Sequence, residues 1–242
     1  MVVAIAMEAE AMPFVEYLGL KLEENFFPSQ APFQAYSGNH NKCQITVVTN
    51  GKDTVYGTGV DNVGTVPAST ATFMTLSKIG KDVDLVINAG TCGGFKAKGA
   101  EIGDVFLTTA SANHDRRIAI PGFVEYGVGL IQSTNTENLA AAINAKHGIC
   151  TTSNSLDHNE DDDKLMLSND ASVKDMEAAA IAWSCKLFDI PHFGVKVVTD
   201  IVDGDRPSHE EFLENLGSAA KSLQAALPKI IDEVCGKGHE EL

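Results

Sequence analysis

The sequence of residues 174–205, KDMEAAAIAWSCKLFDIPHFGVKVVTDIVDGD, contains the pattern that decides the fold. An acidic residue, Glu177, opens a helical pattern of small apolar residues, and the apolar stretch 192–199 that follows has the composition of a buried strand. A second carboxylate, Asp200, comes directly at the end of that stretch. Because ligands of α/β proteins bind where parallel strands end, this unit predicts an acidic binding site at the edge of a sheet.

Strands and helices are expected to alternate over the rest of the chain. This alternation favours a mixed or mostly parallel sheet that is covered by helices, and this arrangement is the α/β class. The chain has 242 residues, no linker-like stretch and no repeat, so it is expected to form a single domain, residues 1–242. Strands are predicted at 2–6, 33–37, 43–50, 84–89, 104–109 and 192–199, and helices at 8–18, 66–79, 135–146, 173–187 and 208–235, the last interrupted near Pro228.

The bulk properties exclude several classes of partner. The formal net charge is −15, which repels the phosphates of nucleic acids and of anionic membranes. No apolar run reaches the roughly 20 residues that span a bilayer, and no basic start to a signal peptide is present. The five cysteines are odd in number and widely spaced, which favours reduced thiols in a cytoplasmic protein over a disulfide framework or a zinc knuckle. They are Cys43, Cys92, Cys150, Cys185 and Cys235.

A glycine-rich stretch, NAGTCGG at residues 88–94, directly follows a predicted strand. Its three glycines would let the backbone turn sharply and approach a ligand, and the Thr91 hydroxyl with nearby N–H groups could hold a hydroxyl, a carboxylate or a phosphate. The alternative is an ordinary turn between a strand and a loop. The stretch matches neither the Walker loop nor the dinucleotide-binding pattern.

Three carboxylates are candidates for chemistry, and each also has a structural explanation. Glu10 and Glu177 lie near predicted helix starts, where the helix dipole stabilises a negative charge. The functional alternatives are a general base for Glu10 and a partner for sugar hydroxyls for Glu177. Asp200 has two explanations. It fits a helix cap or a turn, and it fits equally well a general acid that burial keeps protonated.

No metal site is expected in this chain. The spacing of Asp200, Asp203 and Asp205 differs from that of a calcium-binding loop, and no pair of histidines lies nearby. Asp203 and Asp205 are therefore interpreted as loop structure. The acidic run at residues 157–163 is expected to be a solvated loop, and His114 is expected to have a structural role.

Four segments, taken in order, resemble one enzyme family. They are AMEAE at residues 6–10, INAGTCGGFKAKGAEIGDVFL at 87–107, HDRRIAIP at 114–121, and KDMEAAAIA with VVTDIVDGD at 174–182 and 197–205. Together they are similar to the plant-type 5′-methylthioadenosine/S-adenosylhomocysteine nucleosidases of the purine nucleoside phosphorylase superfamily. The resemblance implies a three-layer α/β/α fold around a mixed, mostly parallel sheet. It also implies hydrolysis of 5′-methylthioadenosine to adenine and 5-methylthioribose in methionine salvage, without a cofactor.

The resemblance also implies a role for each matching residue. Glu10 corresponds to the base that activates the attacking water, Asp200 to the acid that protonates N7 of adenine, and Glu177 to the residue that binds the ribose hydroxyls. The other substrate-binding positions that it implies are Thr91, Gly93, Leu156, Lys174, Asp175 and Met176.

Two features distinguish this chain within the superfamily. Phosphorylases of this type commonly hold phosphate with an arginine at the glycine-rich strand end, where this chain has Asn88, so water is the expected nucleophile, although Lys52 could supply one positive charge. In addition, Ser153 and Asn154 replace a Gly-Asp pair that many relatives have before the purine contacts, which leaves the loop geometry open.

A homodimer is expected from the resemblance, with the segment Ile118–Phe123 of one subunit close to the site of its neighbour. Two alternatives to the hydrolase remain at this point. One is a phosphate-dependent phosphorylase acting on the same nucleoside, and the other is a non-catalytic storage or binding protein with the same fold. The sequence leaves open whether S-adenosylhomocysteine is also accepted.

Overall fold

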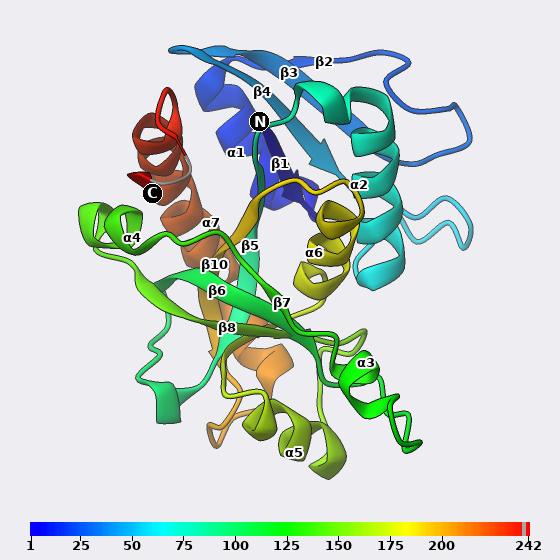
Figure 1. The fold of residues 1–242 in the computed structure, drawn as a ribbon, viewed down its shortest axis with the longest axis vertical. Coiled ribbons are helices and arrows are strands. Elements are labelled where there is room, and N and C mark those ends of the chain that lie inside the picture. The colour runs from blue at the N-terminus through cyan, green and yellow to red at the C-terminus, as the bar shows by residue number, and fades with distance from the viewer. Residues whose placement is uncertain (239–240) are drawn as a thin grey trace.

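The computed structural model describes residues 1–238 and 241–242, and within them a mixed ten-stranded sheet forms the centre of the molecule (Figure 1). The strand order is β10-β6-β8-β9-β5-β1-β4-β3-β2, with β7 paired to β6. The strands are β1 Val2–Ile5, β2 Lys21–Leu22, β3 Gln34–His40, β4 Cys43–Thr49, β5 Val86–Gly94, β6 Val105–Asn113, β7 Ile131–Gln132, β8 Lys146–Thr152, β9 Ala171–Asp175 and β10 His192–Ile201.

Strand β5 is the hub of this sheet. It pairs in parallel with β1 on one side and with β10 on the other, and its last residues also pair with β9 in the antiparallel sense. Because β10 pairs with β6 and β8 pairs with both β6 and β9, five strands close on themselves around the end of β5. The carboxyl ends of β1, β5 and β10 therefore meet at one edge, which is where a ligand site is expected.

Helices cover both faces of the sheet, which confirms the three-layer α/β/α fold. In Figure 1, α1, α4 and α7 lie on one side of the sheet and α2 and α6 on the other. Among the described helices, none is both long enough and apolar enough to cross a membrane. The helices are α1 Glu8–Leu18, α2 Thr65–Ile79, α3 Val124–Val128, α4 Glu137–Ile143, α5 Glu160–Ser168, α6 Ala178–Leu187 and α7 Ser208–Val234.

Two apolar cores correspond to the two helical layers. The larger core joins α1 and α7 to one face of the sheet, with residues such as Phe14, Phe193 and Leu223 fully buried. The smaller core joins α2 and α6 to the other face through Ile181 and Leu76. Burial of an aliphatic or aromatic side chain contributes about 1.5–3 kcal/mol, so these two cores hold the helix–strand units that carry the site.

Four sequence-based element predictions were wrong. Residues 173–187 form β9 and then α6 because antiparallel pairing of β9 with β5 extends the sheet there. The helix predicted at 135–146 ends at Ile143, and 146–152 forms β8 beside β6.

The glycine-rich stretch 90–94 belongs to β5, since both β10 and β9 pair with it. Helix α7 continues through Pro228, because a buried apolar face outweighs the roughly 3 kcal/mol that an internal proline costs.

The acidic run at 157–163 is not only a solvated loop. Its second half begins α5, where Asn159 and Asp162 form a reciprocal capping box, each side chain accepting the other's backbone N–H. Four acidic residues occupy the first turn of this helix, where the helix dipole stabilises negative charge. The capping pattern was present in the sequence and is the signal that would have revealed the helix.

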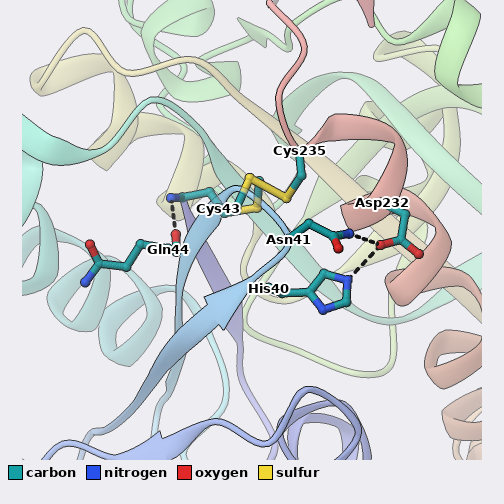
Figure 2. Close-up of a disulfide and its surroundings, with 7 residues drawn as sticks. His40, Asn41, Cys43, Gln44, Asp232 and Cys235 are labelled. Atoms are coloured by element: carbon teal, nitrogen blue, oxygen red, sulfur yellow. Dashed lines mark hydrogen bonds and ion pairs between the residues drawn. A yellow bond between two sulfur atoms is a disulfide. The ribbon is translucent and has the colours of Figure 1, made fainter.

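A disulfide bond joins Cys43 to Cys235, which corrects the expectation that all five cysteines are reduced. The two residues are 192 positions apart, and α7 brings them together by returning to the start of β4, with their Cα atoms 5.6 Å apart. Asp232 on the same helix accepts hydrogen bonds from His40 and Asn41, as Figure 2 shows. Sequence spacing could not reveal a pairing that depends on where the last helix packs. The other three cysteines are free and buried.

This disulfide is expected to stabilise the protein. A crosslink that closes so long a loop restricts the unfolded chain and typically contributes about 2–5 kcal/mol to the free energy of unfolding. We therefore expect Cys43→Ser to lower that free energy by about this amount in urea titrations under non-reducing conditions. Reductant provides the matched control, since it should lower the stability of the unmodified protein and leave the variant unchanged. Equal reductant sensitivity of the two proteins would contradict the assignment.

Candidate active site

A cavity of about 520 Å³ opens at the sheet edge where β1, β5 and β10 end. All nine residues selected from the sequence line it, namely Glu10, Thr91, Gly93, Leu156, Lys174, Asp175, Met176, Glu177 and Asp200. They come from α1, β5, β9, β10 and the loops after β8 and β9. The structure thus brings together every candidate residue, while their individual roles remain predictions.

Glu10 lies in the first turn of α1 and its side chain is almost fully buried. Its Oε1 accepts a hydrogen bond of 2.8 Å from the backbone N–H of Thr91. Burial raises the pKa of Glu10, and the contacts with Thr91 and the charge of Lys196 oppose that rise only in part. A carboxylate that is fixed in place and has a raised pKa is suited to accept a proton near neutral pH.

Asp200 is directed into the cavity by an irregularity in β10. The register between β10 and β5 shifts at Val198 and Asp200, so Thr199 is an extra residue in β10, and such a bulge reorients the next side chain. The carboxyl group is buried, and its Oδ1 accepts a 2.8 Å hydrogen bond from the Thr199 hydroxyl. Burial raises the pKa of Asp200, which extends the pH range over which it keeps a proton to donate.

Glu177 is the residue that precedes α6, and it is buried at the cavity wall. Its Oε1 accepts a 2.8 Å hydrogen bond from the backbone N–H of Gly64, at the start of α2. Burial, followed by the nearby charge of Asp175, raises the pKa of Glu177 to about 7. The first oxygen is therefore engaged by the protein, and the second can accept hydrogen bonds from a ligand.

Asp175 forms an ion pair with Lys196 that sequence reasoning did not find. Lys196 is 1% exposed on β10, and its Nζ lies 2.7 Å from Asp175 Oδ2. Burial opposes both charges, but the pair outweighs it, so the pKa of Asp175 is lowered and that of Lys196 is raised. The other Asp175 oxygen accepts from the Thr152 hydroxyl at 2.6 Å. Asp175 therefore anchors the cavity wall, and the single lysine within the apolar run HFGVKVVT was the available signal.

The glycines of β5 allow both candidate catalytic carboxyl groups to approach the strand. A Cβ atom at Gly90 would lie 3.4 Å from Glu10 Oε2, and one at Gly93 would lie 2.9 Å from Asp200 Oδ2. Both carboxyl groups line the same cavity, so one bound ligand can lie within reach of the two groups.

Substitution of Gly93 by alanine is expected to damage the site selectively. The new Cβ would lie 2.6 Å from Val202 Cγ2 and 2.9 Å from Asp200 Oδ2, so one of these groups must move. Because displacement of a reacting group by about 1 Å can cost about 100-fold in rate, we expect a loss of this size in kcat/KM. Gly90→Ala is the matched control, since its nearest contact is 3.4 Å and should cost less. An equal loss in both variants would contradict the predicted contact.

The three lysines that line the cavity are all engaged by the protein. Lys52 Nζ lies 2.8 Å from Asp61 and 3.4 Å from Glu8, and Lys196 is paired with Asp175. Lys174 Nζ donates to two backbone carbonyl oxygens. No arginine belongs to the cavity lining described here. The side chain of Asn88, at the position where phosphorylases commonly have arginine, donates to Ala4 O at 3.3 Å. A bidentate grip on phosphate is thus absent from these residues.

Two further sequence predictions concern Asp203 and His114. Asp203 accepts hydrogen bonds from the backbone N–H groups of Lys96 and Ala97, which confirms its role in loop structure. The described residues contain no cluster of three or more His, Cys, Asp or Glu side chains that would suit a metal ion. His114 is fully buried with Nδ1 3.0 Å from the Thr151 hydroxyl, and burial lowers its pKa to about 4. It is therefore a neutral structural histidine.

Residues 1–232 match the model of the phosphorylase superfamily. The chain belongs to the phosphorylase superfamily. A 5′-methylthioadenosine nucleosidase of Arabidopsis thaliana is 46% identical over 242 residues, which cover 100% of this chain and 89% of that protein. A 5′-methylthioadenosine/S-adenosylhomocysteine nucleosidase of the same plant is 44% identical over 96% of this chain and 91% of its own length.

Solved structures support the same placement of this phosphorylase superfamily member. The apo structure of the Arabidopsis thaliana 5′-methylthioadenosine nucleosidase has a TM-score of 0.95 and 45% identity, and covers 100% of this chain and 98% of that one. These comparisons confirm the resemblance to the plant-type nucleosidase branch and the three-layer fold expected from the sequence.

Proposed function

We propose that this protein hydrolyses the N-glycosidic bond of 5′-methylthioadenosine, giving adenine and 5-methylthioribose. The observation that carries the proposal is the placement of two buried carboxyl groups, Glu10 and Asp200, beside Gly90 and Gly93 of one strand. Two plant relatives named for this activity are 46% and 44% identical over 100% and 96% of this chain. The proposal treats residues 1–242 as a single domain with one such site.

Asp200 has the role of general acid in this proposal. Cleavage of the C1′–N9 bond would leave negative charge on the purine, and a proton delivered to N7 makes the base a better leaving group. Burial raises the pKa of Asp200, so the group retains its proton at a higher pH than an exposed aspartate does. General acid or base assistance of this kind contributes about 10²–10⁴-fold in rate.

Glu10 and Glu177 act on the sugar side of the bond. Glu10 removes a proton from a water molecule as its oxygen attacks C1′, while the C1′–N9 electron pair moves to the protonated purine. The Gly64 N–H occupies one carboxylate oxygen of Glu177, and the other oxygen accepts hydrogen bonds from the ribose hydroxyls. Thr91, Gly93 and Met176 border the ribose, and Leu156 covers the purine.

An assay of purine release tests the proposal. The purified chain in phosphate-free buffer should release adenine from 5′-methylthioadenosine with a kcat in the usual enzymatic range of about 1–10³ s⁻¹. Parallel reactions with S-adenosylhomocysteine measure how far the 5′ side of the cavity, near Phe212, accepts a longer substituent. Binding of the nucleoside without release of adenine would instead support a storage or binding protein.

The proposal includes a homodimer in which the Ile118–Phe123 segment contacts the neighbouring site. In the single chain, Ile120 is 55% and Phe123 is 49% exposed, and neither lines the cavity. Solvent-exposed apolar side chains of this size favour a partner surface. Light scattering should give twice the mass of the chain, and Ile120→Asp should lower both the mass and kcat. A fully active monomer would exclude this part of the proposal.

A cytoplasmic location and a place in methionine salvage complete the proposal. The three free cysteines would remain reduced in that compartment. The Cys43–Cys235 bond does not support a reducing location, because disulfides are rare in the cytosol. Fractionation of cells that produce the protein, followed by thiol labelling of the fraction that contains it, measures its location and the redox state of its cysteines.

A further inference from the structure

Lys174 is a buried lysine whose ammonium group is held by backbone carbonyl oxygens. It lies on β9, lines the cavity, and is buried like its neighbours on the strand. Its Nζ donates hydrogen bonds to Ser155 O at 3.0 Å and to Leu156 O at 2.6 Å. Among the described residues, no carboxylate oxygen lies close enough to form an ion pair with it. A buried charge needs compensating contacts, and here the loop after β8 supplies them.

The loop held by Lys174 forms one wall of the cavity. Leu156 lines both the main cavity and a neighbouring cavity of about 400 Å³. Nearer to β8, the loop is fixed by the Ser153 hydroxyl, which donates to Ser155 O at 2.9 Å, and by Asp115, which accepts from the backbone N–H of Asn154 at 2.9 Å. Of these contacts, the ammonium of Lys174 is the one that reaches Leu156 from the cavity side.

Lys174 and Asp200 line the same cavity, and their charges act on each other there. Burial lowers the pKa of Lys174, and the Asp200 carboxylate is the largest of the charges that oppose this shift. The Lys174 charge in turn favours the ionised form of Asp200. The groups that face Lys174 from the surrounding elements are Asp200 of β10, Asp175 of β9, Asp157 of the loop after β8 and Asp162 of α5. Those that face Asp200 are Lys174, the Thr199 and Ser208 hydroxyls, and Glu211 of α7.

We propose that Lys174 is a positioning residue that acts through two groups: it holds Leu156 against the base-binding end of the cavity, and its charge opposes protonation of Asp200. This inference rests on the proposed function, and it assigns Lys174 to the loop and to Asp200 instead of to direct substrate contact. Loss of the charge should therefore weaken substrate binding and at the same time extend general-acid catalysis to higher pH.

The test uses Lys174→Met, which keeps the length of the side chain and removes its charge and donors. Loss of hydrogen bonds to a charged group should lower kcat/KM by about 10- to 100-fold, mainly through KM. The alkaline limb of the pH profile of kcat should move to higher pH, because the ammonium no longer stabilises ionised Asp200. A loss of kcat/KM with the limb unmoved would overturn the electrostatic part of the proposal.

Two further variants separate the two effects. Lys174→Gln retains a hydrogen-bond donor without the charge, so its alkaline limb should move as in Lys174→Met while its KM rises less. Lys174→Arg retains the charge, so its alkaline limb should stay at the wild-type position, and it also serves if the methionine variant does not fold. Lys164→Met on α5 is the matched control and should behave as the wild type, because this side chain is exposed and its one ion pair within the described residues is with Asp161.

Hydrogen exchange of the free protein provides a readout that needs no catalysis. Amides of residues 155–158 should exchange at least about 10-fold faster in Lys174→Met than in the wild type or Lys164→Met, since an anchor of the loop is lost. Unchanged exchange there would overturn the positioning role even if the enzyme is active. Conversely, absence of adenine release by the wild type would reject the proposed function while the exchange result still decides how Lys174 acts on the loop.

Discussion

Replacement of Asp200 by asparagine is expected to lower kcat by about 10²–10⁴-fold, the range that general acid catalysis contributes. The asparagine side chain has a similar shape and can still accept the 2.8 Å hydrogen bond from the Thr199 hydroxyl, so the cavity should keep its form. It has no acidic proton to transfer to N7 of the purine. Steady-state rates of adenine release, measured over a range of pH, check this prediction.

The pH profile adds a second criterion for Asp200. In the wild type, kcat should fall as pH rises through the raised pKa of Asp200, since the deprotonated group can no longer donate. The Asp200→Asn variant should lack this alkaline limb. Asp205→Asn is the matched control, because Asp205 is an exposed residue of the turn that follows β10. Comparable losses in both variants would show that the acid is not Asp200.

Replacement of Glu10 by glutamine should have an effect of similar size, again about 10²–10⁴-fold in kcat. The glutamine carbonyl oxygen can still accept the hydrogen bond from the Thr91 backbone N–H, so the side chain should remain in place. An amide cannot accept the proton of the attacking water. Single-turnover measurement of adenine release separates this chemical step from product release.

Glu10 should also account for the acidic limb of the profile of kcat/KM. Burial raises the pKa of Glu10, so the ionised base is lost as pH falls through that raised value, above the usual range of a glutamate. The Glu10→Gln variant should lack this limb and keep the alkaline one. Glu16→Gln, on the exposed side of the same helix, is the control and should retain both limbs. Because the pKa of Glu177 is also raised, a retained acidic limb in Glu10→Gln that Glu177→Gln removes would assign that limb to Glu177 instead.

The parts of the fold that could be predicted from sequence are those with strong local patterns. The helix at residues 8–18 is rich in residues that favour a helix, and the strand that ends near Asp200 is an apolar run. Each of these patterns is compatible with few other kinds of secondary structure. Strand β9 was missed because its residues, ASVKD, pair with β5 and β8 and have no apolar pattern of their own. The same holds for β8, whose partners are distant in sequence.

The site could be located from sequence, but its internal contacts could not. Glu10, Glu177 and Asp200 were selected as carboxylates at element ends, and the topology brings all three to one cavity. The partner of Asp175 depends on where β9 and β10 lie in space, so the pair with Lys196 was not visible in either segment alone. The contact of Lys174 with the Leu156 carbonyl depends in the same way on a loop 18 residues earlier.

The identity of the sugar product formed in the presence of phosphate tests the central claim most directly. The chain should be incubated with 5′-methylthioadenosine and an excess of phosphate. The products should then be separated and identified by mass spectrometry. Water as the nucleophile predicts 5-methylthioribose and adenine in equal amounts, at a rate that does not change when phosphate is omitted. Formation of 5-methylthioribose 1-phosphate, with no adenine release in the absence of phosphate, would contradict the hydrolytic mechanism.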